Sequence, residues 1–412
     1  MSSVIDYLTW RGDVTFDACP LGEVDNLIFS LMSYIDFDGI VPAEQTAAGV
    51  TVREAAKEYF FRYPDESSAG ARRLGLIVPP EILTVFRQMA ESERYGQLLL
   101  RGFVNEICEE HEMQFSAVTV VLPDDSLYVA FRGTDDTLVG WKEDFNLSYM
   151  DAVPSQRKAA AYLNAVPVTN KTRLYVGGHS KGGNLAVWGA VHADDGIRRA
   201  IARVYSNDGP GFSAAVLSSD AYREMADRMT FLVPPAAVVG LLLDNAGTYE
   251  VVCSGAKNGL FQHNAMTWEV LGNRFVRADG LSHKGVHTDT VTRARIDGMT
   301  ADEKRTLINL FFDLLQRTGA KTLTELYDGR VKHSLTILRE IGDMDKETKE
   351  ATHYLINKFF GIRQNESSKR QHLAALSSKQ APKTTERVTV ELMLPVYMKK
   401  IKNILNKFSE NA

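Results

Sequence analysis

The sequence contains little cysteine, with three residues in a chain of 412. Cys19, Cys108 and Cys253 are odd in number and widely spaced, and no C-x-x-C pair occurs. An odd, scattered set argues against a disulfide framework, and the missing pairs argue against a zinc site. We therefore expect the protein in a reducing compartment, the cytoplasm, with no metal.

Charge of one sign and long apolar runs are also lacking. The 47 Lys and Arg nearly balance 52 Asp and Glu, which leaves a net charge of -5. This balance gives no attraction to nucleic acid, so we expect no nucleic-acid partner. The longest apolar run, residues 231–243 (FLVPPAAVVGLLL), contains two prolines and is shorter than the roughly 20 residues needed to cross a bilayer. The opening MSSVIDYLTWRGDVTF carries charges where a secretion signal needs an apolar core.

Hydrophobic periodicity divides the chain into regions. Residues 1–112 have apolar positions at helical spacing, which predicts a helical N-terminal region packing on the core. Residues 113–297 form the core: FSAVTVVL and SLYVAFRG predict a hairpin, and from about 170 strands alternate with helices. Such alternation is typical of an α/β fold with parallel strands. Within this core, FLVPPAAVVGLLL predicts a buried strand followed by the start of a helix, with a segment or lid that lines an acyl-chain pocket as the alternative.

The C-terminal third contains a helical region, a polar region and a second helical region. Residues 298–364 are helical in pattern, with a capping box at Thr300 and Glu303. Residues 365–388 predict a polar linker, and residues 389–412 predict an amphipathic helix rich in lysine. We favour packing of that helix on the protein itself over contact with a membrane surface. The pattern carries no signal for an oligomeric state.

A G-x-S-x-G motif at Gly178, Ser180 and Gly182 raises the question of chemistry. It lies in RLYVGGHSKGGNLA, with an apolar strand pattern before the serine and a helical pattern after it. A nucleophile elbow requires this context, since its strained turn needs small flanking residues. The alternative is a glycine-rich turn without chemistry.

A serine nucleophile also needs hydrogen-bond donors for the oxyanion that forms on the substrate. In such folds one donor is the backbone N–H of the residue after the serine, here Lys181 at the start of a helix. The second comes from the loop after an earlier strand. LYVAFRGTDD offers Gly133 and Thr134 at that place.

The motifs together resemble a known family. VAFRGT followed by Trp141 and Asp144, the elbow GGHSKGGNLA and the later SNDGPGF are similar to the class 3 (fungal-type) lipases. The opening YLTWRGDVTF, the QFSA at 114–117 and the QHN at 262–264 resemble a bacterial branch of that group. The similarity covers about residues 4–330. It implies an α/β-hydrolase fold with helical N-terminal and C-terminal regions, Ser180 as nucleophile, Thr134 and Lys181 as oxyanion donors, and His263 as base.

The base and acid should follow the serine in the order serine, acid, histidine. His263 satisfies this order, and His283 and His287 are its rivals. In the lipases the acid follows the strand after the Gly-Pro turn, where no aspartate stands here. Asp244 is the nearest candidate and is preferred, and Asp208 is the second, with the alternative that it only shapes the DGPG turn.

These observations predict a serine hydrolase that cleaves carboxylic esters, with a small acyl ester or acyl lipid as substrate. One alternative is an inactive hydrolase fold kept as an interaction protein, for which the missing acid is the clue. Another is a thioesterase or peptidase that uses the same serine. No cofactor is expected. Glu143 and Asp144 lack companion ligands at metal-binding spacing, so no metal is assigned.

Overall fold

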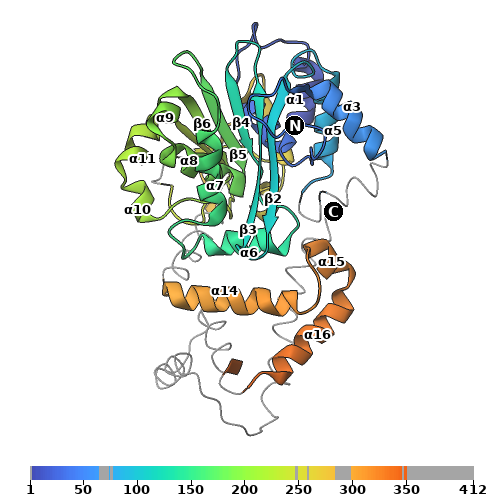
Figure 1. The fold of residues 1–412 in the computed structure, drawn as a ribbon, viewed down its shortest axis with the longest axis vertical. Coiled ribbons are helices and arrows are strands. Elements are labelled where there is room, and N and C mark those ends of the chain that lie inside the picture. Colours follow the sequence, from blue (N-terminus) through green and yellow to red (C-terminus); the bar gives the residue numbers. More distant parts are fainter. Residues whose placement is uncertain are drawn as a thin grey trace.

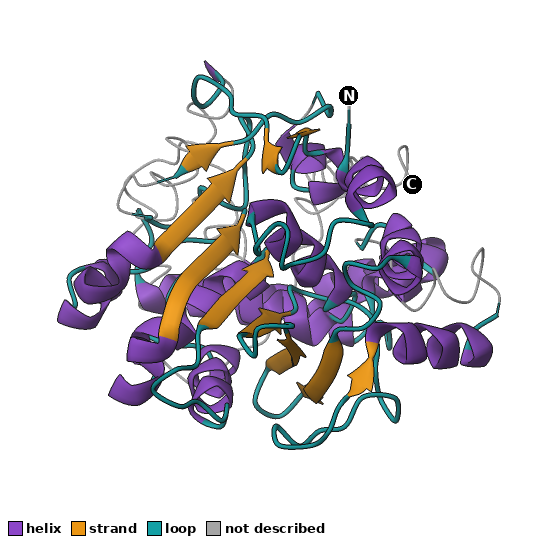
Figure 2. Cartoon of the chain, turned by 90° about the horizontal axis from the view of Figure 1, so that it is seen from above, coloured by secondary structure: helices purple, strands orange, loops and turns teal. Residues whose placement is uncertain are grey.

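The protein is built around one eight-stranded sheet with helices on both faces, which makes it an α/β protein (Figure 1). The computed structural model describes residues 2–64, 74, 78–245, 249–257, 259–283, 298–345 and 348–349. The predicted linker 365–388 and amphipathic helix 389–412 lie outside the described residues. Figure 2 shows the strands crossing the middle of the molecule with helices on either side.

The strands lie in the sheet in the same order as in the chain, and only the first four alternate in direction. The first four strands pair antiparallel, and from β4 to β8 all pairs are parallel. A separate antiparallel pair joins β9 and β10. The strands are β1 (Val50–Thr51), β2 (Leu99–Cys108), β3 (Met113–Val121), β4 (Leu127–Phe131), β5 (Leu174–His179), β6 (Ile201–Asn207), β7 (Met229–Val233), β8 (Glu250–Val251), β9 (Val270–Leu271) and β10 (Arg274–Phe275).

The helices lie between and after these strands. They are α1 (Val4–Arg11), α2 (Glu23–Met32), α3 (Val52–Arg62), α5 (Glu81–Glu91), α6 (Leu138–Asn146), α7 (Pro154–Asn164), α8 (Lys181–His192), α9 (Asp195–Ala200), α10 (Ala214–Leu217), α11 (Asp220–Met225), α12 (Gly259–Gln262), α14 (Ala301–Gln316), α15 (Leu323–Asp328) and α16 (Arg330–Asp343), with the short 3-10 turns η2 (Ala226–Arg228) and η3 (Ala265–Thr267). None of the helices described is long and apolar enough to cross a membrane.

The N-terminal region is less helical than its sequence pattern predicts. It supplies β1 and the ten-residue β2, so the expected boundary at residue 112 cuts through the β2–β3 hairpin. The strand was missed because β2 is a half-buried strand near the sheet edge, with polar residues such as Arg101, Asn105 and Glu106 among the apolar ones. Such a strand does not show a clean alternation in sequence.

The core has two layers because side chains alternate across each strand. On β4, Tyr128 and Ala130 face a cluster built with the N-terminal helices. Leu127, Val129 and Phe131 face a second cluster built with α7 and α8. Burial on both faces explains why β4 is apolar throughout, as parallel central strands are.

A buried polar network joins α2 to the ends of the central strands. Asn207, the last residue of β6, donates from Nδ2 to the Gly178 carbonyl over 2.9 Å. Asn26 on α2 donates to Asn207 Oδ1 over 2.9 Å, and the Tyr128 hydroxyl donates to Asn26 Oδ1 over 2.8 Å. Because every partner is buried and hydrogen-bonded, the network fixes the positions of the ends of β5 and β6.

The C-terminal helices pack beneath α6, at the end of the sheet where the parallel strands terminate (Figure 1). Phe312 of α14 meets Phe145 edge-on with ring centroids 5.7 Å apart. The predicted capping box at Thr300 and Glu303 opens α14, as expected. The Leu138 N–H donates to the Lys321 carbonyl over 2.9 Å, which attaches the start of α6 to the segment before α15.

The apolar stretch at residues 231–243 contains the predicted strand but not the predicted helix start. β7 ends at Val233, and turns rather than a helix follow it through Asp244. The Leu242 and Asp244 carbonyls accept, over 2.7 Å each, from N–H groups of the loop after β6, so the stretch bonds to that loop instead of forming the hydrogen bonds of a helix. The turns fold over the end of β6 and cover the carboxylate of Asp208.

Candidate active site

Ser180 occupies a sharp turn between β5 and α8. Its backbone has φ 58° and ψ -132°, a region that non-glycine residues rarely adopt and that stores strain. The Ser180 N–H donates to the Asn207 carbonyl over 2.9 Å, which holds the turn against β6. The surrounding hydrogen bonds therefore maintain a conformation that presents the hydroxyl at the end of the sheet.

Glycines flank the serine because the backbone segments touch there. A Cβ added at Gly182 would lie 2.2 Å from the Phe131 carbonyl oxygen, and one at Gly178 would lie 2.2 Å from the Gly182 carbonyl carbon. Real Cβ atoms do not approach so closely, so any side chain would push the turn away from β4. The G-x-S-x-G spacing is a packing requirement of this turn.

One imidazole and one carboxylate form a chain with this hydroxyl. His263 Nε2 lies 3.0 Å from Ser180 Oγ, and His263 Nδ1 lies 2.6 Å from Asp208 Oδ2. A carboxylate can only accept, so Nδ1 carries the proton and Nε2 is free to accept from the serine. His283 is exposed and His287 lies outside the described residues, so the structure brings only one of the three candidate histidines, among those it describes, to Ser180.

The carboxylate beside His263 is Asp208, not the preferred Asp244. Asp208 follows β6 directly, is fully buried, and adopts φ 50°. Asp244 instead pairs through its backbone with Phe212, whose N–H donates to the Asp244 carbonyl over 2.7 Å. The Gly240 N–H donates to Asp208 Oδ1 over 3.1 Å, so the apolar stretch after β7 covers this carboxylate rather than supplying the one beside His263.

His179, next to the nucleophile, contacts the loop that carries His263. Its Nε2 lies 2.8 Å from the His263 carbonyl oxygen, and its Nδ1 lies 3.2 Å from the Tyr34 hydroxyl. The carbonyl can only accept, so Nε2 carries the proton and Nδ1 accepts from Tyr34. Burial, together with the electrostatic effect of the neighbouring His263 ring, lowers the pKa of His179 to about 3. His179 is therefore a neutral donor across the physiological range.

The two expected oxyanion donors flank the nucleophile turn. A Cβ added at Gly133 would lie 2.6 Å from the His179 carbonyl oxygen, so the turn before Thr134 is in contact with the turn that carries Ser180. Within the described part of the chain, neither the Thr134 N–H nor the Lys181 N–H donates a hydrogen bond. Both amides are available to a developing negative charge.

Helix α6 holds Thr134 through the Asp144 carboxylate. The Thr134 hydroxyl donates to Asp144 Oδ2 over 2.5 Å, and Asp144 Oδ1 is buried with no hydrogen-bond partner among the described residues. Burial raises the pKa of Asp144 to about 6. The orphaned oxygen agrees with that direction, because burying an unpaired carboxylate oxygen disfavours the charged form.

The neighbouring Glu143 forms a fully buried ion pair with Lys181. Lys181 Nζ lies 3.0 Å from Glu143 Oε2, and neither side chain is exposed. Glu143 also accepts from the Gln114 N–H and the Ser155 N–H, over 3.0 and 2.8 Å. The pair is therefore fully hydrogen-bonded, which such a pair needs in order to offset its desolvation.

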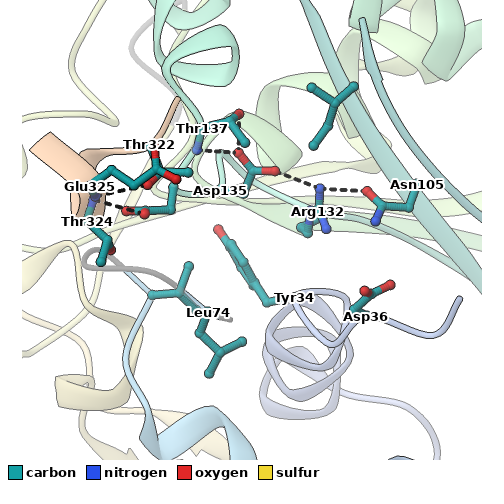
Figure 3. Close-up of a pocket in the computed structure, with 13 residues that line it drawn as sticks. Tyr34, Asp36, Leu74, Asn105, Arg132, Asp135, Thr137, Thr322, Thr324 and Glu325 are labelled. Carbon is teal, nitrogen blue, oxygen red and sulfur yellow. Dashed lines mark hydrogen bonds and ion pairs between the residues drawn. The ribbon is translucent and has the colours of Figure 1, made fainter. Parts of the chain in front are cut away.

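A cavity of about 390 Å³ lies on the flank of the Gly133–Thr134 turn (Figure 3). Arg132 before the turn and Asp135 after it are paired over 3.0 Å, and both line the cavity. Tyr34, the partner of His179, lines it as well, in the middle of the view in Figure 3. The cavity thus reaches residues on both sides of the Gly133–Thr134 turn. No group of three or more metal-ligating side chains occurs within the residues described.

Comparison with known proteins identifies the family. The model of the family described as Mbeg1-like matches residues 89–313, more than half of the chain. The chain belongs to the Mbeg1-like family. The matched Mbeg1-like region runs from the end of α5 into α14 and contains Thr134, Ser180, Asp208 and His263.

Two further comparisons add nothing to the family assignment. No curated protein matches the chain significantly. A solved structure, that of M37 lipase, is 14% identical and matches with a TM-score of 0.32, covering 54% of this chain and 70% of the other. The α/β assignment of this Mbeg1-like protein accordingly rests on its own sheet.

Sequence reasoning missed three residues of the site. His179 was noted only as part of the elbow, Gln114 only as part of QFSA, and Glu143 only as a rejected metal ligand. A signal was present for His179, since it adjoins the serine. The buried partners of Gln114 and Glu143 lie 67 and 38 positions away along the chain, so no local pattern could show them.

We expect His179→Gln to change how stability depends on pH. The folded protein holds His179 neutral down to about pH 3, whereas the unfolded chain protonates it below about pH 6.5. The contribution of the neutral His179 to the free energy of unfolding is therefore complete above pH 6.5. It is lost as the pH falls toward 3, by up to about 1.4 kcal/mol per pH unit. Urea unfolding at pH 7.5 and 5 should show the wild-type free energy of unfolding falling about 2 kcal/mol more than that of the variant. Equal changes in both proteins would contradict the buried, neutral imidazole.

We expect Lys181→Met to lower the free energy of unfolding by about 3–5 kcal/mol, because it leaves the Glu143 carboxylate buried without a counter-charge. The double variant Lys181→Met/Glu143→Gln should recover a large part of this loss, since both charges are then gone. Urea unfolding followed by circular dichroism measures both. A single variant as stable as the wild type would show that the pair is not desolvated as described.

Proposed function

We propose that the protein is a serine hydrolase that cleaves carboxylic esters, with an acyl ester or acyl lipid as substrate. The observation that carries the proposal is the continuous chain Ser180–His263–Asp208, with contacts of 3.0 and 2.6 Å. Membership of the Mbeg1-like family, which is lipase-like, supports the same class. The parallel sheet with its strand–serine–helix turn supports an α/β-hydrolase fold.

The proposed reaction begins at the serine hydroxyl. His263 Nε2 accepts the Ser180 proton as Oγ attacks the ester carbonyl, and Asp208 stabilises the imidazolium that forms. The Thr134 and Lys181 N–H groups bind the oxyanion. When the C–O bond breaks, His263 returns the proton to the leaving alcohol and an acyl-serine remains. Water, deprotonated by the same imidazole, then attacks the acyl carbon. The bond from that carbon to Ser180 Oγ breaks, the imidazolium returns the proton to Oγ, and the carboxylic acid is released.

The alternative of an inactive interaction protein rested on the missing acid. Asp208 stands beside His263 in this structure, buried and hydrogen-bonded on both oxygens. A carboxylate held in this way stabilises a protonated imidazole and keeps the ring in the tautomer that can accept from serine. We therefore favour a catalytic triad of Ser180, His263 and Asp208 over an inactive protein that only binds partners.

The first test is chemical labelling of the serine. Purified protein is incubated with a fluorophosphonate probe and with p-nitrophenyl esters of several chain lengths. We expect labelling and turnover in the wild type, and loss of both in Ser180→Ala, because the probe reacts only with an activated hydroxyl. Ser218→Ala, at an exposed serine, should behave as wild type. Persistent labelling in Ser180→Ala, or an inert wild type, would refute the proposal.

The second test separates the two candidate acids. We expect Asp208→Asn to lower kcat by roughly 10³–10⁴ with little change in KM, because asparagine favours the wrong imidazole tautomer. Asp244→Asn is the matched control, and we expect less than about a threefold change, within the range of substitutions away from the chemistry. Steady-state kinetics on the best ester measure both. The reverse order of effects would restore Asp244 as the acid.

A further inference from the structure

Gln114, on β3, contacts the Lys181 side chain and the Gly133 carbonyl, and its side chain has a determined orientation. The residue is fully buried. Lys181 Nζ donates to Gln114 Oε1 over 2.6 Å and to the Gln114 carbonyl over 2.9 Å. An ammonium group can only donate, so the amide atom that faces it is the oxygen and the other is the NH2 group.

That NH2 group faces the turn that carries the first donor. Gln114 Nε2 lies 3.5 Å from the Gly133 carbonyl oxygen, a long hydrogen bond. The Gly133 carbonyl and the Thr134 N–H belong to one planar peptide unit, so they point in opposite directions. A donor that holds this carbonyl toward Gln114 therefore keeps the Thr134 N–H turned away from Gln114.

Buried charges keep Gln114 itself in place. Glu143 Oε2 accepts from the Gln114 N–H over 3.0 Å and from Lys181 Nζ over 3.0 Å. Glu143 and Lys181 thus form hydrogen bonds with the backbone N–H, the backbone carbonyl and the side-chain oxygen of Gln114. Gly140 leaves room for the amide, since a Cβ there would lie 3.1 Å from Gln114 Oε1.

We propose that Gln114 is a positioning residue that prevents the Gly133–Thr134 peptide from flipping, so that its N–H remains available to the oxyanion. The inference rests on the proposed ester hydrolysis. A peptide that follows glycine rotates with little steric hindrance. If it flipped, it would present a carbonyl oxygen where the oxyanion forms, and the like partial charges would repel. Lys181 contributes twice, with its backbone N–H as a donor and its side chain as the anchor of Gln114.

Three variants test this role. Gln114→Met keeps the side-chain length but removes both amide contacts. Gln114→Glu keeps an acceptor for Lys181 but places a carboxylate oxygen opposite the Gly133 carbonyl. The matched control is Gln156→Met, because Gln156 is also buried and amide-bonded, to Asn184 Oδ1 and the Val153 N–H, and none of its hydrogen bonds among the described residues is to Gly133, Thr134 or Lys181.

Kinetics, labelling rate and melting temperature are measured on each protein. Both Gln114 variants should lose about 10-fold to 100-fold in kcat with KM within about threefold, less than the 10²–10³ that follows removal of a whole oxyanion donor. Fluorophosphonate labelling and inhibition by a trifluoromethyl ketone, which forms a tetrahedral adduct, should weaken in parallel. Gln156→Met should change the melting temperature but not kcat. Should Gln114→Met fail to fold, Gln114→Glu decides the result.

The outcomes separate this inference from the proposed function. An active wild type whose Gln114 variants are as active as Gln156→Met would overturn the positioning role and leave the hydrolase intact. Equal losses of kcat in the Gln114 variants and in Gln156→Met would assign a general packing role instead, and would also overturn it. A wild type without labelling or turnover would remove the proposed function and this inference together.

Discussion

The parallel register of β4, β5 and β6 is the constraint on which the site depends. Phe131 pairs with Gly178, and His179 pairs with Asn207. The next residue on each of the last two strands is therefore Ser180 and Asp208, at the same level of the sheet. Because parallel strands end at one edge, three separate segments bring Thr134, Ser180 and Asp208 to one place.

Buried polar groups then set the finer geometry. The Lys181–Glu143 pair, the Asp208 carboxylate and the neutral His179 all lie away from water, where each would be costly alone. Each is hydrogen-bonded to the backbone of a neighbouring element, so displacement of any one leaves another unpaired. This shared requirement makes the arrangement around the serine rigid, and preorganised donors are what stabilise a developing charge.

Much of the fold could be predicted from the sequence because its signals are local. The hairpin of β3 and β4, the strand–serine–helix turn and the capped helix α14 each depend on residues within about ten positions. β2 was not predicted, since a half-buried strand near the sheet edge lacks regular alternation. Residues 234–243 were predicted to start a helix, but they are apolar because they cover Asp208. Burial, rather than local propensity, determined both.

The sequence by itself determined the order of the chemical groups: a turn after β4, a serine flanked by glycines, then an aspartate and a histidine in the required succession. Only the tertiary structure decided which aspartate meets His263, which imidazole supports its loop, and which amide orients the Gly133–Thr134 peptide. Those choices depend on contacts between residues 19 to 84 positions apart. Such distances follow from strand register and helix packing, and no spacing along the chain encodes them directly.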